Sequence, residues 1–149
     1  MRLISWSLPL LVLFLFSPEA HTKEQETVSL RVRVDSLRNS KGAIQFSLYN
    51  KKGSIPDEKF KRFYRQKVML VVKKSSWATF KNLPKGTYAV SIHHDENRNG
   101  KINKGLIFPT EGIGFSNYKK INLTNRPNFS DASFEVKADM KKSIKIIYF

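Results

Sequence analysis

The stretch VSLRVRV, residues 28–34, has an apolar residue at every second position, with serine or arginine between them. Side chains alternate between the two faces of a β-strand, so this segment would bury one face and leave the other in water. A helix would instead need apolar residues three and four positions apart. The pattern therefore predicts a half-buried strand over residues 28–34.

The same alternation continues after the turn NSKG, residues 39–42. It predicts six further strands, at residues 44–49, 68–72, 77–80, 87–94, 132–137 and 143–149. The strand at 68–72 is apolar throughout, so we expect it to be more fully buried than the others. Seven strands joined by turns, without long helices between them, favour an all-β fold, namely a seven-stranded antiparallel β-sandwich.

Residues 56–66, PDEKFKRFYRQ, depart from this pattern. Proline at the first position and acidic residues in the first turn favour one short helical segment here. Phe60, Phe63 and Tyr64 would then form an apolar stripe at helical spacing, which we expect to pack on the sheet.

The first 20 residues are typical of a secretory signal peptide, with a basic start, a short apolar run and small or turn-forming residues after it. The run is too short to span a bilayer, although Pro18 makes the cleavage site imperfect and leaves an uncleaved anchor as an alternative. We expect an N-terminal extension at 21–27, a single domain at 28–149 and no transmembrane segment after signal removal. The mature protein would be periplasmic, outer-membrane-associated or secreted. The chain has no cysteine, which excludes disulfides and a lipidated cysteine.

The chain is strongly basic, with 27 lysines and arginines against 12 acidic residues and a formal net charge of +15. The excess is densest between residues 51 and 74, and such a surface attracts polyanions through long-range fields. The predicted polyanion-binding residues are Lys51, Lys52, Lys59, Lys61, Arg62, Arg65 and Lys67. Export favours an acidic protein, anionic lipid or acidic polysaccharide as the partner and argues against nucleic acid. The alternative is that these residues only keep the protein soluble.

The stretch DENRNGKIN, residues 95–103, places oxygen-bearing side chains at alternate positions and a glycine after the third of them. Calcium loops take ligands at positions 1, 3, 5 and 9, and a backbone carbonyl at position 7. Counted in this way, the candidate ligands are Asp95, Asn97, Asn99, the Lys101 carbonyl and Asn103. Position 12 is Leu106 and not a glutamate, so Glu96, Glu111 or Asp131 would have to fold back to complete the shell.

Calcium is the one cofactor that this loop suggests, with weak binding on the order of 10⁻⁴–10⁻³ M. The alternative is a polar turn ordered without an ion, because Asp and Asn side chains readily bond their own backbone. Gly100 would supply the positive φ in either case.

Ser116, His94 and Asp95 have the residue types for nucleophilic catalysis, but no nucleophile elbow is present. We therefore expect no enzyme, and a hydrolase is the lesser alternative. Ser116 and Asn117 are expected to bond backbone groups beside a buried Phe115. On the strand at 87–94, His94 would face the core and His93 the other side, so the two could not chelate one ion together.

Four stretches of the sequence carry a family resemblance. LPKGTY, residues 83–88, resembles the turn of transthyretin-like (prealbumin-type) sandwiches and of collagen-adhesin B-type modules. HDENRNGK, PTEGIGFSN (109–117) and FSDASFEV (129–136) resemble the bacterial domain of unknown function 2141, over about residues 28–149. The resemblance implies an exported, single-domain, transthyretin-like sandwich without an established activity. That family commonly has Asp where this chain has Asn103, in a loop about one residue longer, so a cation site here would carry less negative charge.

These observations predict an exported, non-catalytic binding or structural module of the bacterial cell envelope. Its basic surface would take an acidic partner, and a calcium-stabilised module is the alternative.

Overall fold

The computed structural model describes residues 26–149, so the predicted signal peptide and most of the predicted extension lie outside the described residues. The chain is mostly β, with almost no helix. Its elements are β1 (Thr27–Val34), β2 (Ala43–Tyr49), β3 (Arg65–Leu70), β4 (Ser76–Pro84), β5 (Gly86–Asp95), β6 (Ile113–Phe115), α1 (Phe129–Ala132), β7 (Phe134–Val136) and β8 (Met140–Ser143).

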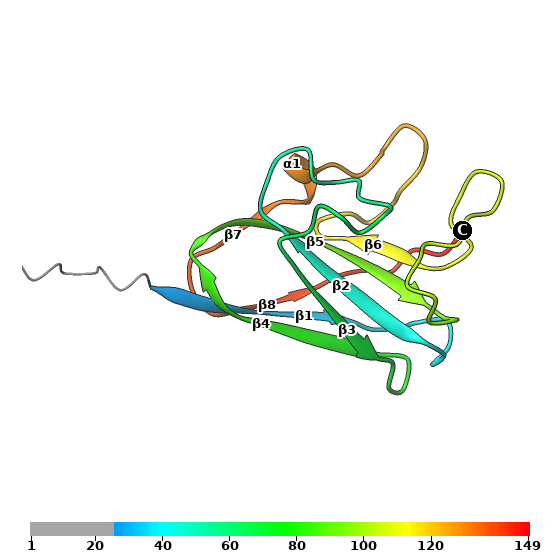
Figure 1. Cartoon of the computed structure of the whole chain (residues 1–149), viewed down its shortest axis with the longest axis horizontal. Coiled ribbons are helices and arrows are strands. Elements are labelled where there is room, and N and C mark those ends of the chain that lie inside the picture. The colour runs from blue at the N-terminus through cyan, green and yellow to red at the C-terminus, as the bar shows by residue number, and fades with distance from the viewer. Residues whose placement is uncertain (1–25) are drawn as a thin grey trace, which may run out of the picture.

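The strands form two sheets (Figure 1). One has the order β4-β1-β8, and the other has the order β3-β2-β5-β6, with β7 pairing the start of β5. All neighbouring strands are antiparallel except β1 and β8, which run parallel from Leu30 opposite Met140. The prediction of a seven-stranded, entirely antiparallel fold is therefore wrong in two respects: β8 runs parallel to β1, and the described residues form eight strands.

Alternate residues of both sheets form one buried apolar cluster. In β1 the predicted alternation is confirmed, since Leu30, Val32 and Val34 are fully buried while Arg31 and Arg33 are exposed. Their cluster partners include Phe46 of β2 and Val90 of β5 in the other sheet. Each such side chain stabilises the fold by roughly 1.5–3 kcal/mol.

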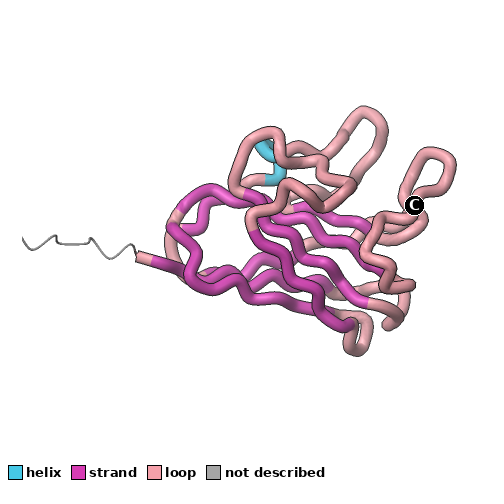
Figure 2. The backbone as a smooth tube through the Cα atoms, in the orientation of Figure 1, coloured by secondary structure: helices cyan, strands magenta, loops and turns pink. Residues whose placement is uncertain are grey.

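The five-stranded sheet is buried on both faces along β2, where all seven residues are buried. Its outer face is covered by the loops after β2 and β6 and by α1, which lie on the same side of the sheet (Figure 2). A second apolar cluster lies under them, formed by Tyr49, Ile55, Ala89, Tyr118, Phe129 and Ala132. These loops and α1 therefore take the place of a third layer of regular structure.

The prediction of a helical segment at residues 56–66 is wrong. These residues form a series of turns and bends that leads into β3. Phe60 has a φ of 49°, outside the helical region. The Asp57 carboxylate accepts hydrogen bonds from the backbone nitrogens of Lys61 (3.0 Å) and Arg62 (2.8 Å), so these amides are taken from helical bonding. Phe63 and Tyr64 are exposed rather than packed on the sheet.

The strand predicted at 68–72 is also corrected, because β3 is an edge strand and not a buried one. Val68 and Leu70 are 57% and 62% exposed. A run of apolar residues marks a strand equally well at an edge and at the centre of a sheet, and only the pairing tells them apart.

The last third of the chain differs most from prediction. The strand expected at 132–137 divides into the end of α1 and β7, and the strand expected at 143–149 is reduced to an isolated bridge between Ile147 and Ile113. Strands β6 and β8 were not predicted. Gly114 in β6 permits this arrangement, since a Cβ there would lie 2.4 Å from the Lys145 carbonyl oxygen.

Among residues 26–149, no helix has the length and hydropathy needed to cross a membrane.

Candidate functional site

The candidate loop begins where β5 ends. Asp95 is the last residue of β5 and is 3% exposed. Its Oδ1 accepts a hydrogen bond from the Asn99 nitrogen (3.1 Å) and its Oδ2 from the Gly100 nitrogen (2.8 Å). Gly100 has a φ of 73°, which confirms the predicted positive φ. The carboxylate therefore folds the chain back over the end of its own strand.

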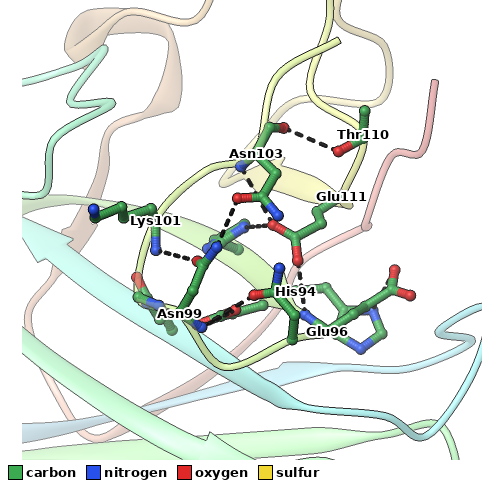
Figure 3. A network of polar contacts seen from close by, with 12 residues as sticks. His94, Glu96, Asn99, Lys101, Asn103, Thr110 and Glu111 are labelled. Atoms are coloured by element: carbon green, nitrogen blue, oxygen red, sulfur yellow. Dashed lines mark hydrogen bonds and ion pairs between the residues drawn. The ribbon is translucent and has the colours of Figure 1, made fainter.

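The asparagines continue this pattern (Figure 3). Asn97 Oδ1 accepts from the Asn99 nitrogen (3.0 Å), and Asn99 Oδ1 accepts from the Lys101 nitrogen (2.8 Å). Asn99 Nδ2 donates to Asn103 Oδ1 (2.8 Å). Each of these side-chain oxygens has two lone pairs. Asp95 Oδ2 has two described partners and each of the others has one, so most of them can accept a further ligand. Self-bonding of the loop and cation binding are thus compatible rather than exclusive.

Glu111 reaches this loop from the segment before β6 (Figure 3). The side chain is buried, and its Oε1 accepts from the Glu96 nitrogen (3.0 Å) while its Oε2 accepts from the Asn103 nitrogen (3.4 Å). The carboxylate therefore holds both ends of the loop. Leu106, at position 12 of the calcium count, is fully exposed.

Of the three acidic residues expected to fold back, Glu111 is the one that contacts the loop backbone in this way. The Glu96 side chain turns instead to Arg38 and Asn39, accepting from Arg38 Nε (2.7 Å) and Asn39 Nδ2 (2.8 Å). Burial raises the pKa of Glu96, but the bonds from Asn39 and Arg38 outweigh it and hold the pKa below its usual value. Asp131 lies at α1, where Asn128 donates to its carboxylate (2.6 Å).

The two histidines face opposite sides of β5, as predicted. His93 is 1% exposed, and its Nε2 lies 3.0 Å from Glu111 Oε2. Because a carboxylate accepts, this nitrogen carries the proton. Burial lowers the pKa of His93, and the bond to Glu111 offsets part of that effect.

Two buried polar atoms near the loop have no partner among the described residues: His93 Nδ1 and Gln45 Oε1. Gln45 and His93 are directly opposite each other in the β2–β5 pairing. Gln45 Nε2 donates weakly to Asp95 Oδ2 (3.4 Å), which orients the amide. A buried acceptor without a donor costs roughly 1–3 kcal/mol, so this part of the sheet face has unused bonding capacity.

His94 is a fully buried, hydrogen-bonded residue at the core, as expected. Its Nε2 donates to the Lys41 carbonyl (2.8 Å), so in the neutral ring Nδ1 accepts from the Tyr148 hydroxyl (2.8 Å). Burial raises the pKa of Tyr148, which keeps that hydroxyl a donor. Arg38 stacks over the Tyr148 ring at 4.6 Å. This cluster joins the C-terminal segment to the strand β5.

The catalytic residue types are not brought together as a triad. Ser116 is fully buried, and its Oγ accepts from the Val90 nitrogen (2.9 Å) and donates to the Ala132 carbonyl (2.5 Å). Asn117 Nδ2 likewise donates to backbone carbonyls. The prediction that these two residues bond backbone is confirmed, and Ser116 is not bonded to His94.

The predicted polyanion-binding residues divide into two groups. Arg62 donates to the carbonyls of Gly53 (2.8 Å) and Pro56, and Arg65 donates to those of Lys81 (2.6 Å) and Asn82 (3.1 Å). These two arginines therefore hold neighbouring backbone. The other residues of the set are exposed and have no ion pair or side-chain hydrogen bond to any residue from 26 to 149; we call them the lysine surface, and they are Lys51, Lys52, Lys59, Lys61 and Lys67.

Three contributors to the loop's surroundings were missed by the sequence analysis, namely Gln45, Tyr148 and Arg38. Gln45 could have been found from the alternation, because it occupies the face of β2 opposite the core. Within the described part of the chain, no three His, Cys, Asp or Glu side chains are grouped to hold a metal. The oxygens that the loop offers come mainly from asparagine and backbone.

The comparisons place this chain by family alone. No curated protein matches it, and no solved structure matches it. The profile of a bacterial family, described as "Uncharacterized protein conserved in bacteria (DUF2141)", matches residues 32–145, which include strands β2 to β8, the end of β1 and the whole candidate loop. The chain therefore belongs to the DUF2141 family of bacterial proteins.

Proposed function

We propose that this protein is an exported, non-catalytic binding module of the bacterial cell envelope that takes an acidic partner on its lysine surface. Its two sheets would be those of a transthyretin-like β-sandwich. The observation that carries the proposal is the set of five exposed lysines that form no ion pair with any residue from 26 to 149, in a chain of net charge +15. Unpaired surface charges of one sign raise the local concentration of polyanions.

The rigidity of the segment around these lysines supports the proposal. Arg62 and Asp57 bond the loop after β2 to itself, and Arg65 joins β3 to β4 through backbone carbonyls. Lysines on a segment held in this way lose less conformational freedom on binding than they would on a free tail.

Binding to vesicles containing phosphatidylglycerol, to polygalacturonate and to an acidic protein would test the proposal. We expect binding to at least one of them that weakens steeply between low and physiological salt. The variant Lys51→Glu, Lys52→Glu, Lys59→Glu, Lys61→Glu should lose it. Its matched control carries Lys81→Glu, Lys119→Glu, Lys141→Glu and Lys145→Glu, which change the net charge equally, and should retain most of it. Equal loss in both variants would show that net charge, and not this surface, is responsible.

A calcium-stabilised module is the second candidate, favoured by Glu111. A buried carboxylate that bonds both ends of the loop could supply the acidic ligand that Leu106 does not. The shell would comprise Asp95, Asn97, Asn99, the Lys101 carbonyl and Asn103, with Glu111 beside them.

Calorimetry and thermal unfolding with CaCl₂ would test this candidate. We expect a dissociation constant on the order of 10⁻⁴–10⁻³ M and a matching upward shift in melting temperature. Asn97→Ala should abolish the shift at little cost to stability, because Asn97 makes one exposed hydrogen bond. Asn125→Ala, at another exposed turn, is the control and should keep the shift. Absence of both heat and shift in the unmodified protein would leave a self-bonded turn.

A further inference from the structure

A pocket of about 300 Å³ lies on the outer face of β5 and β6. Its floor includes Ser91 and His93 of β5 together with Ile113 and Phe115 of β6. The walls come from three loops, at residues 56–60, 102–109 and 121–127, and from Phe149. The loops extend from the same side of the molecule (Figure 1). This pocket uses neither the lysine surface nor the oxygens of the calcium candidate.

The lining is mainly apolar. Aromatic rings surround part of the space: Phe60 stacks on His93 with centroids 5.7 Å apart, and Phe108 stacks on Phe149 at 4.6 Å. Small-molecule sites typically have apolar walls with a few convergent polar groups and begin at about this volume. A dry apolar cavity of about half this size holds one benzene ring, so two fused rings are the expected bulk.

The histidine in the floor has a defined requirement. His93 Nε2 donates a hydrogen bond to Glu111 Oε2, so the neutral ring has a bare lone pair at Nδ1. This atom is buried and has no partner among residues 26–149, so a ligand reaches it by displacing part of the lining. A bare acceptor in an apolar site is satisfied by a donor and not by another acceptor. The missing partner is therefore an O–H or N–H group.

The charges of the lining favour a neutral molecule. Asp57 and Glu58 offset Lys104 and Arg126. Lys104 is paired with Glu58 (2.5 Å), and Asp57 is bonded by backbone nitrogens at Lys61 and Arg62. The pocket lining therefore has no excess of positive charge, unlike the chain as a whole.

We propose that the pocket binds a neutral, apolar small molecule of about two fused rings in bulk, whose single O–H or N–H donor bonds His93 Nδ1. The walls supply most of the affinity through burial, and His93 supplies selectivity for the donor.

Two probes of nearly equal shape test this proposal. 2-Naphthol carries the donor, and 2-methylnaphthalene replaces it with a methyl group. We expect 2-naphthol to bind about tenfold more tightly, as one satisfied buried acceptor implies. In protein labelled with ¹⁵N-histidine, the Nδ1 resonance of His93 should shift with 2-naphthol and stay in place with 2-methylnaphthalene.

Two adjacent loop residues provide matched variants. Ile107 lines the pocket, whereas Leu106 is fully exposed and does not. Ile107→Asp should weaken 2-naphthol binding at least tenfold, and Leu106→Asp should leave it unchanged. If neither probe binds at millimolar concentration, or if both variants bind equally well, the pocket is not a ligand site. Equal affinity for the two probes, or an unmoved Nδ1 resonance, would mean that water satisfies His93 and would overturn the donor requirement.

Discussion

At the scale of single residues, two glycines separate backbone strain from steric exclusion. Gly42 and Gly53 have nearly the same φ, 69° and 74°. A Cβ on Gly42 would meet the Asp95 carbonyl oxygen at 2.0 Å, whereas one on Gly53 would meet nothing within 4 Å. The turn after β1 can therefore lie against the start of the candidate loop because residue 42 has no side chain.

We predict that Gly53→Ala costs about 1 kcal/mol, the usual cost of a left-handed alanine. Gly42→Ala should cost about 2 kcal/mol more, because the backbone at Asp95 must move. Urea unfolding of both variants measures the difference. Equal costs would mean that the contact between the turn and the loop is not tight in solution.

The buried His93 should make the stability of the protein depend on pH. Burial places its folded pKa below the ordinary value of 6.5, so the unfolded chain binds the proton more readily. The free energy of unfolding should therefore be constant above about pH 7.5 and fall as the pH drops below 6.5. The slope cannot exceed about 1.4 kcal/mol per pH unit for one proton.

Urea midpoints measured from pH 8 to pH 5 would check this dependence. His93→Gln should remove the slope between pH 7 and pH 5. Glu96→Gln should leave it in place, because the lowered pKa of Glu96 affects stability only in more acidic solution, below about 4.5. A slope that survives in His93→Gln would assign it to other groups.

At the scale of elements, one hydroxyl joins three parts of the chain. Ser116 lies just after β6, and its Oγ bonds the Val90 nitrogen of β5 and the Ala132 carbonyl at the end of α1. It satisfies two backbone groups that have no strand neighbour at this point. The residue that most resembles a nucleophile in the sequence is thus a connector of β5, β6 and α1.

We predict that Ser116→Ala destabilises the protein by about 2–3 kcal/mol, because it leaves a buried donor and a buried acceptor unsatisfied. The Val90 amide should lose protection from hydrogen exchange. Ser133→Ala is the control, since the Ser133 hydroxyl donates to the exposed Ser130 carbonyl and its removal should cost less than about 1 kcal/mol. Unchanged exchange at Val90 would contradict the connecting role.

At the scale of the whole molecule, the charge of +15 opposes compactness. The Debye length is about 30 Å at 0.01 M salt and about 8 Å at 0.15 M, so salt should screen repulsion between distant lysines. We predict that the free energy of unfolding in urea rises between these salt concentrations. A fall would show that the ion pairs of the described residues outweigh the repulsion. The lysine-to-glutamate variants should each show a smaller rise, because both lower the net charge.

Prediction from the sequence was most accurate where apolar and polar residues alternate over a whole strand. The strands over residues 28–34, 44–49 and 87–94 appear as β1, β2 and β5, and the turn at Gly100 has the expected φ. The prediction of a helix at 56–66 was wrong. The apolar residues there have helical spacing, but the Asp57 carboxylate accepts hydrogen bonds from the backbone amides that a helix would use. In the candidate site, the order of Asp95, Asn97 and Asn99 was readable, but the approach of Glu111 was one of three possibilities.

The sequence by itself determined the period of the strands, the excess of positive charge, the self-bonding residue types of the 95–103 loop and the family. These properties depend on neighbours within a few residues, where geometry follows from the covalent chain. Only the tertiary structure decided that β3 lies at an edge, that β8 runs parallel to β1 and that Glu111 rather than Glu96 or Asp131 reaches the loop. It also placed His93, whose buried Nδ1 has no partner among the described residues, in the lining of an apolar pocket. Such contacts join residues distant in sequence, and packing selects among them by free energies that no short stretch contains.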